Sequence, residues 1–116
     1  MAGTDAVVAA RLRVADTHWT RLRGLLGTHE LPAGDGLWIR PCRQVHMFGM
    51  RYAIDVVFLD DGCRIVGLTE SLGPWRVSPL VKAASSVLEL PPGTIAHTEL
   101  RAGQVVTIEP RSPSAG

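Results

Sequence analysis

Residues 52–68 read YAIDVVFLDDGCRIVGL, and this stretch decides the fold. Its first apolar run, from 52 to 59, is interrupted only by Asp55, and a second run resumes after the turn residues Asp60-Asp61-Gly62. Two apolar runs of strand length that flank an Asp-Gly turn predict a β-hairpin.

Shorter runs on both sides of this hairpin predict further strands. They lie at residues 7–14, 37–39, 75–77, 86–90 and 104–109. In the first of them, the alternation of side chains along a strand places Leu12 and Val14 inward and Arg11 and Arg13 outward. The sequence therefore predicts a half-buried strand at its beginning.

Two helical segments are predicted beside the strands. The first spans residues 17–26, because Asp16-Thr17 offers an N-cap and apolar residues recur at helical spacing until Gly27. The second is one or two turns at 94–97, directly after Pro91-Pro92-Gly93. Because the crossover helices of a parallel sheet are missing, we predict a mainly β fold. We expect a single compact β-sandwich or small barrel of short, mostly antiparallel strands.

The composition is that of an ordinary globular protein. The chain has 116 residues, of which 46% are apolar and 20% charged, which predicts one domain over 1–109 followed by a flexible tail over 110–116. Twelve basic and eleven acidic residues give a net charge of +1, too small for a general attraction to nucleic acid or anionic membrane, so any basic patch has to be local. With no apolar stretch near the ~20 residues of a membrane span and no leader peptide, we predict a cytoplasmic location.

The hairpin and three other segments resemble the domain-of-unknown-function 192 (DUF192) family. The segments that carry the resemblance are 53–66, 14–27, 88–93 and 100–104, so that it extends from about Arg11 to Ile108. The resemblance implies a β-sandwich-like fold and no established activity, so no catalytic residue is carried over from it. The chain departs from the family at its centre, where it has His46-Met47-Phe48-Gly49-Met50 in place of a common Trp-Met-Lys-Asn-Thr run, and Ala53 in place of a common proline.

The segment 41–51 has the highest density of side chains that can do chemistry. With neighbouring candidates, it gives the set Cys42, Arg43, His46, Met47, Met50, Arg51, Asp55 and Trp75. Cys42 and His46 could form a thiolate–imidazole pair, and with Asp55 they could hold a metal. The simpler interpretation is a buried thiol, a structural histidine, and a carboxylate that accepts backbone N–H groups or pairs with an arginine.

Two hypotheses about function follow. The first is a non-enzymatic binding or accessory module, in which the 41–51 loop and the loop at 71–79 form a shallow recognition surface for a protein or small-molecule partner. The second is a small enzyme or metal-binding protein that uses Cys42, His46 and Asp55. Because no CxxC or HxxxH motif is present, we expect no cofactor and no native metal, and the small net charge argues against a nucleic-acid partner.

Overall fold

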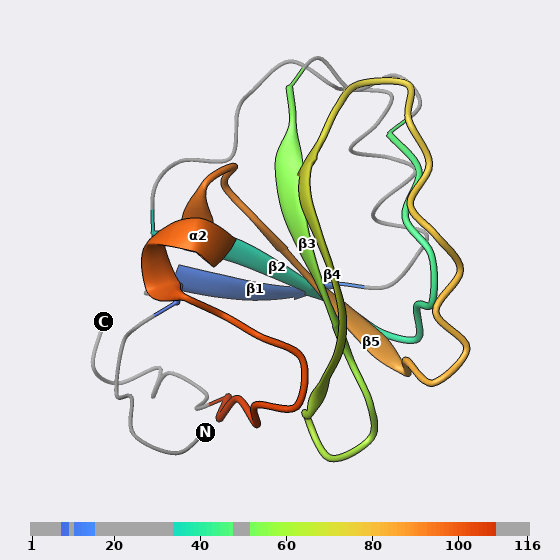
Figure 1. The fold of residues 1–116 in the computed structure, drawn as a ribbon, viewed down its shortest axis with the longest axis vertical. Helices are drawn as coiled ribbons and strands as arrows, with labels where there is room; N and C mark the ends of the chain where they lie inside the picture. The colour runs from blue at the N-terminus through green and yellow to red at the C-terminus, as the bar shows by residue number, and fades with distance from the viewer. Residues whose placement is uncertain (1–7, 10, 16–33, 48–51, 109–116) are drawn as a thin grey trace.

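The computed structural model describes residues 8–9, 11–15, 34–47 and 52–108. These residues form a five-stranded sheet in the order β1-β2-β5-β3-β4 (Figure 1). The strands are β1 (Arg11–Ala15), β2 (Asp35–Ile39), β3 (Ile54–Leu59), β4 (Ile65–Leu72) and β5 (Ser86–Leu90). Strands β1 and β2 pair in parallel, and the other neighbours pair antiparallel. The predicted mainly β fold of mostly antiparallel strands is therefore confirmed.

Of the two predicted helices, one lies in the described part of the chain and the other does not. The late helical turn is helix α2 (Thr94–Thr98), as the sequence predicted. The helix predicted at 17–26 lies outside the described residues. In the described part of the chain, no helix has the length and apolarity needed to cross a bilayer. The cytoplasmic location stays a prediction.

The predicted hairpin is formed by β3 and β4. The Oδ1 atom of Asp60 accepts hydrogen bonds from the backbone N–H groups of Gly62 and Arg64, both at 2.9 Å, and these bonds close the turn. Every residue of β3 is buried, and so is every residue of β5, its neighbour in the sheet. An apolar run without alternation is typical of a strand that is covered on both faces.

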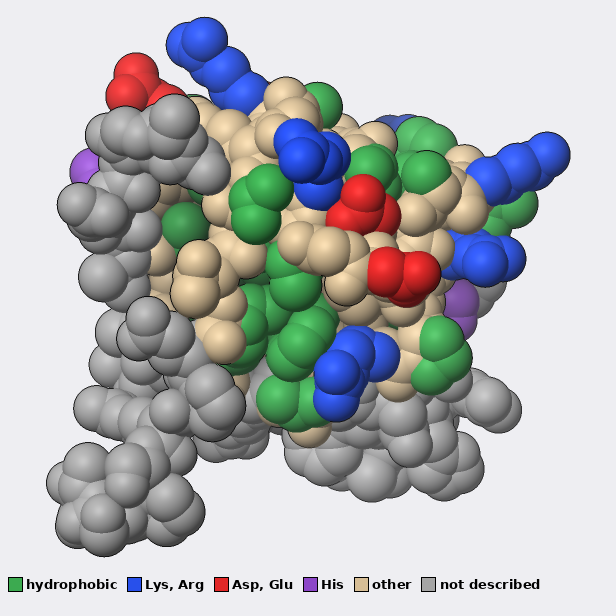
Figure 2. All heavy atoms as spheres, turned by 90° about the horizontal axis from the view of Figure 1, so that it is seen from below, with side chains coloured by type: hydrophobic (Ala, Val, Ile, Leu, Met, Phe, Trp, Pro, Cys, Tyr) green, Lys and Arg blue, Asp and Glu red, His purple; other side chains and the backbone are tan. Residues whose placement is uncertain are grey.

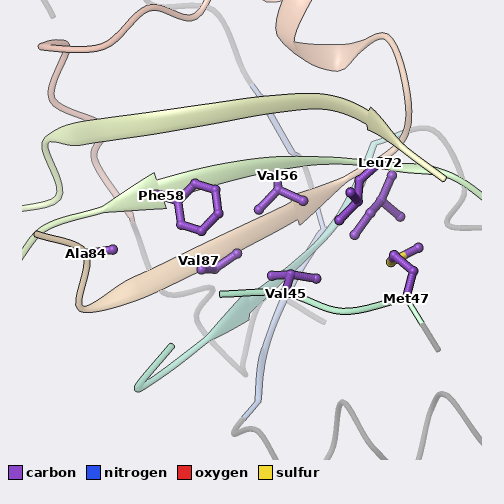
Figure 3. Close-up of a cluster of buried hydrophobic side chains, with 8 residues drawn as sticks. Val45, Met47, Val56, Phe58, Leu72, Ala84 and Val87 are labelled. Atoms are coloured by element: carbon purple, nitrogen blue, oxygen red, sulfur yellow. The ribbon is translucent and has the colours of Figure 1, made fainter. Parts of the chain in front are cut away.

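Two clusters of buried side chains cover the two faces of the sheet. On one face, Val56, Phe58 and Val87 pack against Val45 and Met47, which come from a segment outside the sheet (Figure 3). On the other face, the cluster consists of residues from β3, β4, β5, α2 and the segment that follows α2: Val57, Leu59, Ile65, Leu88, Leu90, Ile95 and Leu100. The sheet thus lies in the middle of the core.

The first face is covered by two irregular segments, 42–47 and 73–85, which we call the outer layer. They run side by side on the right of Figure 1, while α2 lies on the left. Backbone hydrogen bonds join the two segments at several points. Trp75 N–H donates to Met47 O (2.9 Å) at one end, and Cys42 N–H donates to Ser85 O (3.1 Å) at the other. The layer approaches the sheet closely at Gly67, where an added Cβ would lie 3.3 Å from both Phe58 Cδ1 and Val81 Cγ2.

Two of the predicted strands are wrong. Residues 75–77 form only an isolated antiparallel bridge between Val77 and His46, and residues 104–109 form only a bridge between Val105 and Arg64 in the part that is described. Both segments follow tight turns and form irregular hydrogen bonds. The alternation of side chains alone therefore predicted regular strands where the structure has single bridges.

The prediction that Val14 faces inward is also wrong, since its side chain is 59% exposed. Leu12, on the same face of β1, packs at the margin of the second cluster. Strand β1 is the edge of the sheet. The core therefore ends along β1 before it reaches Val14.

Ser78 joins the two segments of the outer layer through its side chain. Its Oγ accepts a hydrogen bond from Val45 N–H at 2.9 Å, and its own N–H donates to Val45 O at 2.8 Å. Because Ser78 is buried, we expect Ser78→Ala to lower the free energy of unfolding by about 1–3 kcal/mol, the cost of a buried N–H left without an acceptor. Urea denaturation measures this change. Ser85→Ala is the matched control, because Ser85 bonds to Leu59 O through its backbone, and an equal loss in both variants would contradict the assigned role.

Candidate functional site

The outer layer brings together the two loops that the sequence singled out. Met47 N–H donates to Arg76 O at 2.8 Å, and Val81 N–H donates to Arg43 O at 2.9 Å. Of the predicted site residues, this layer holds Cys42, Arg43, His46, Met47 and Trp75. Met50 and Arg51 lie outside the described residues.

Side chains in the outer layer alternate between the core and the surface. Val45 and Met47 are buried against the sheet, at 3% and 0% exposure, which places Met47 in the core and not on a binding surface. His46, between them, is exposed and lies opposite Val77 in the isolated bridge. The outward face of the layer therefore includes His46 and Val77.

Large apolar side chains are exposed along the second segment of the layer. Trp75 is 67% exposed, Val77 48% and Leu80 56%. Trp75 follows Pro74 in a turn and has a positive φ of 66°, a conformation that costs energy for a residue with a Cβ. Sequence reasoning named Trp75 and placed Val77 inside the predicted 71–79 recognition loop, but it named neither Val77 nor Leu80 as a site residue.

The outer layer carries a charge imbalance that the whole chain does not. It contains three exposed basic residues, Arg43, Arg76 and Lys82, and no Asp or Glu, which gives it a formal charge of +3. Since the chain as a whole carries +1, the remaining residues sum to −2. By contrast, acidic and basic side chains lie close together on the face seen in Figure 2. The small net charge of the chain thus conceals an excess of basic residues in the outer layer.

Cys42 is a half-buried thiol above the sheet. Its S–H donates to Gln44 O at 3.2 Å. Burial raises the pKa of the Cys42 thiol, and the negative charge of Glu89 adds to this effect. A thiol with a raised pKa is protonated near neutral pH and is a poor nucleophile.

Glu89 is a buried carboxylate that sequence reasoning overlooked. Its side chain is 0% exposed. Glu89 in β5 lies directly opposite Val56 in β3, and paired residues point to the same face of a sheet. Glu89 therefore faces the outer layer, as Val56 does. The signal was available, because Glu89 interrupts the apolar strand 86–90 in the same way as Asp55 interrupts 52–59. Carboxylates at such positions are costly to bury and call for an explanation.

Asp55 connects three elements on the other face of the sheet. It is fully buried, and its Oδ1 accepts a hydrogen bond from Ser71 N–H at 2.9 Å while its Oδ2 accepts one from Ile95 N–H at 2.8 Å. Ile95 lies in the first turn of α2, whose cap residue Gly93 makes no side-chain capping bond. Asp55 in β3 therefore caps α2 from a distance in the sequence. The prediction that Asp55 accepts hydrogen bonds from backbone N–H groups is confirmed. The donors, however, are Ser71 and Ile95, which follow Asp55 in the chain, and not the loop that precedes it.

The structure does not bring Cys42, His46 and Asp55 together. Asp55 pairs with Leu90 in the second cluster, whereas Cys42 packs against the first cluster, so the sheet separates them. His46 is on the outward face of the layer and is exposed. Within the described ranges, no group of three or more His, Cys, Asp or Glu side chains is arranged to hold a metal ion.

Comparisons with known proteins agree with the resemblance seen in the sequence. The chain belongs to the DUF192 family of uncharacterized proteins, whose model matches residues 2–108. It is 32% identical over 108 residues to a UPF0127 protein of Thermococcus sibiricus, a match that covers 89% of this chain and 69% of the relative. A UPF0127 protein of Thermococcus kodakarensis is 32% identical over 104 residues, covering 86% and 66%.

The fold also matches a solved structure. A crystal structure of a protein of unknown function from Novosphingobium aromaticivorans superposes with a TM-score of 0.68 at 20% identity, over 79% of this chain and 70% of that protein. At this identity the match supports the fold alone. The family and the fold are therefore established, and the function has to be argued from the surface itself.

Removal of the Asp55 carboxylate is expected to destabilise the whole sheet. Asp55→Ala leaves the buried N–H of Ile95 without an acceptor, which should lower the free energy of unfolding by about 1–3 kcal/mol, and the partly buried N–H of Ser71 adds a smaller loss. Urea or thermal denaturation followed by circular dichroism measures this. In the control Asp60→Ala, water can replace the lost bonds of an exposed turn, and a loss of about 1 kcal/mol or less is expected. Similar losses in the two variants would contradict the assigned role of Asp55.

The Cys42 thiol is expected to react slowly. In a Cys63→Ser variant, which leaves Cys42 as the single thiol, alkylation by iodoacetamide near neutral pH should be several-fold slower in the folded protein than in urea. The raised pKa lowers the thiolate fraction, and partial burial limits access. Mass spectrometry follows the rate. Alkylation in the folded protein that equals or exceeds the rate in urea would indicate an activated nucleophile instead.

Proposed function

We propose that this chain is a non-enzymatic binding module that contacts its partner through the outer layer. One observation carries the proposal: Trp75, Val77 and Leu80 are exposed on one segment that is fixed to the core by backbone hydrogen bonds. Five large apolar side chains are exposed among the described residues, and three of them belong to this segment. Grouped apolar side chains at a surface are typical of an interaction site.

The composition of the layer supports the same conclusion. Trp75 and Arg76 belong to the residue types that are enriched in interfaces and contribute most to their binding energy. The layer is also pre-organised, because Ser78 and Met47 tie it to the core from the inner side. A rigid scaffold lowers the entropy lost when a partner binds.

The alternative of a small enzyme or metal-binding protein has less support. It requires Cys42, His46 and Asp55 to converge, and Asp55 faces the cluster on the opposite side of the sheet. The raised pKa of Cys42 also argues against a thiolate nucleophile. We therefore favour binding over catalysis.

Site-specific photo-crosslinking in the native host tests the proposal. A photoreactive benzoylphenylalanine introduced in place of Val77 should give discrete adducts with cellular components, because this side chain points away from the core. The same substitution of Val105, which is 38% exposed in the segment after α2, is the matched control and should give none.

A second change links the adducts to the surface itself. Leu80→Ser should remove the adducts from position 77 and leave the midpoint of thermal unfolding unchanged, because Leu80 is exposed. Equal adducts from positions 77 and 105, or adducts from 77 that persist in Leu80→Ser, would overturn the proposal.

A further inference from the structure

We propose that the partner of the outer layer is the surface of an anionic membrane. This inference rests on the proposed function, because it names the partner of the same surface. It combines two properties of the layer, its exposed apolar side chains and its exposed basic side chains.

The apolar side chains project from one side of the layer. Val45, Met47 and Ala84 are buried in the core, Ser78 is buried, and Cys42 and Val81 pack against the first cluster, so these positions face inward. Trp75, Val77 and Leu80 are all close to half exposed or more. Side chains in this arrangement can enter the boundary between headgroups and acyl chains while the backbone stays outside.

Tryptophan suits that boundary particularly well. Its ring is apolar, its N–H is polar, and it is enriched where membrane meets water. Trp75 stands at the turn that begins the exposed segment, with the highest exposure among the large apolar side chains described. It is therefore the side chain we expect to penetrate furthest.

The charge of the layer complements an anionic surface. Arg43, Arg76 and Lys82 are exposed, and no acidic residue stands in either segment. Basic side chains near an anionic leaflet attract it, and long ones can reach the headgroups while their stems cover apolar surface. The carboxylate of Glu89 faces the layer from the sheet but is 0% exposed, so the charges that the layer presents at its surface are the basic ones.

A membrane fits these observations better than a folded protein. Protruding side chains at a protein interface require complementary pockets in the partner, whereas a fluid surface adapts to them. Three basic residues alone are fewer than the clusters that hold proteins on anionic lipid, and stable attachment needs a second signal. Exposed Trp75 and Leu80 supply that signal.

Co-sedimentation of the full chain with lipid vesicles tests the inference. We expect binding to phosphatidylcholine vesicles that contain about one third phosphatidylglycerol, and at least about tenfold weaker binding to phosphatidylcholine alone. Raising the salt to about 0.5 M should weaken the binding, because it screens the charges.

Matched variants assign the binding to the layer. Arg76→Glu should weaken it by about tenfold or more, and Arg101→Glu, an exposed charge in the segment after α2, should not. Trp75→Ser should weaken binding, whereas Trp75→Phe should retain most of it and Val105→Ser all of it. Thermal melts check that these exposed substitutions leave folding intact.

The outcomes separate this inference from the proposed function. If vesicles do not bind, or if Arg101→Glu weakens binding as much as Arg76→Glu, the inference is overturned. If vesicles do not bind but position 77 crosslinks to a protein, the binding module stands with a protein partner and the membrane is the wrong partner. If neither vesicles nor crosslinks are found, both proposals fail.

Discussion

The arrangement of this protein depends on one buried carboxylate. Asp55 stands in β3, between β5 and the edge strand β4, and its two oxygens each accept a hydrogen bond from a backbone N–H of a different element, the end of β4 and the first turn of α2. Burial of a charge is costly, and hydrogen bonds from N–H groups that would otherwise lack partners offset that cost. The same residue therefore holds α2 against one face of the sheet and fixes the point where the chain leaves β4. From that point the chain enters the outer layer on the opposite face.

As a consequence, the two faces of the sheet have different roles. On the face toward α2, apolar side chains from the strands, the helix and the segment after it make a closed cluster around Asp55. On the other face, the outer layer closes the core with Val45 and Met47 (Figure 3). The same layer presents Trp75 and Val77 to the outside. Because the layer lacks regular strand pairing, its outward residues are less constrained by the sheet. Binding surfaces are commonly built in this way, on loops held by a rigid scaffold.

The sequence predicted the central elements well and the outer ones poorly, for a physical reason. The hairpin, β5 and α2 are governed by local signals: long apolar runs, the Asp60 turn, and Pro-Pro-Gly before Thr94. The outer layer has no such signal, because its structure follows from hydrogen bonds between residues about 30 positions apart, such as that of Val45 with Ser78. For the candidate site, the pairing of the two loops was expected, but Glu89 was overlooked and the convergence of Cys42, His46 and Asp55 was not found. Neighbours in a strand point to opposite faces, and sequence proximity does not reveal which face each residue takes.

The departure of this chain from the usual family pattern also has a structural meaning. The chain has His46-Met47 where the resemblance implies a Trp-Met pair. Met47 is at 0% exposure in the core, so a methionine there serves packing, whereas His46 lies on the outward face opposite Val77. An exposed position such as that of His46 can change without affecting the core. Among the described residues, Trp75 on the neighbouring segment of the same layer is an exposed tryptophan. A surface whose outward positions can change without affecting the core can diverge in what it binds while the fold stays the same.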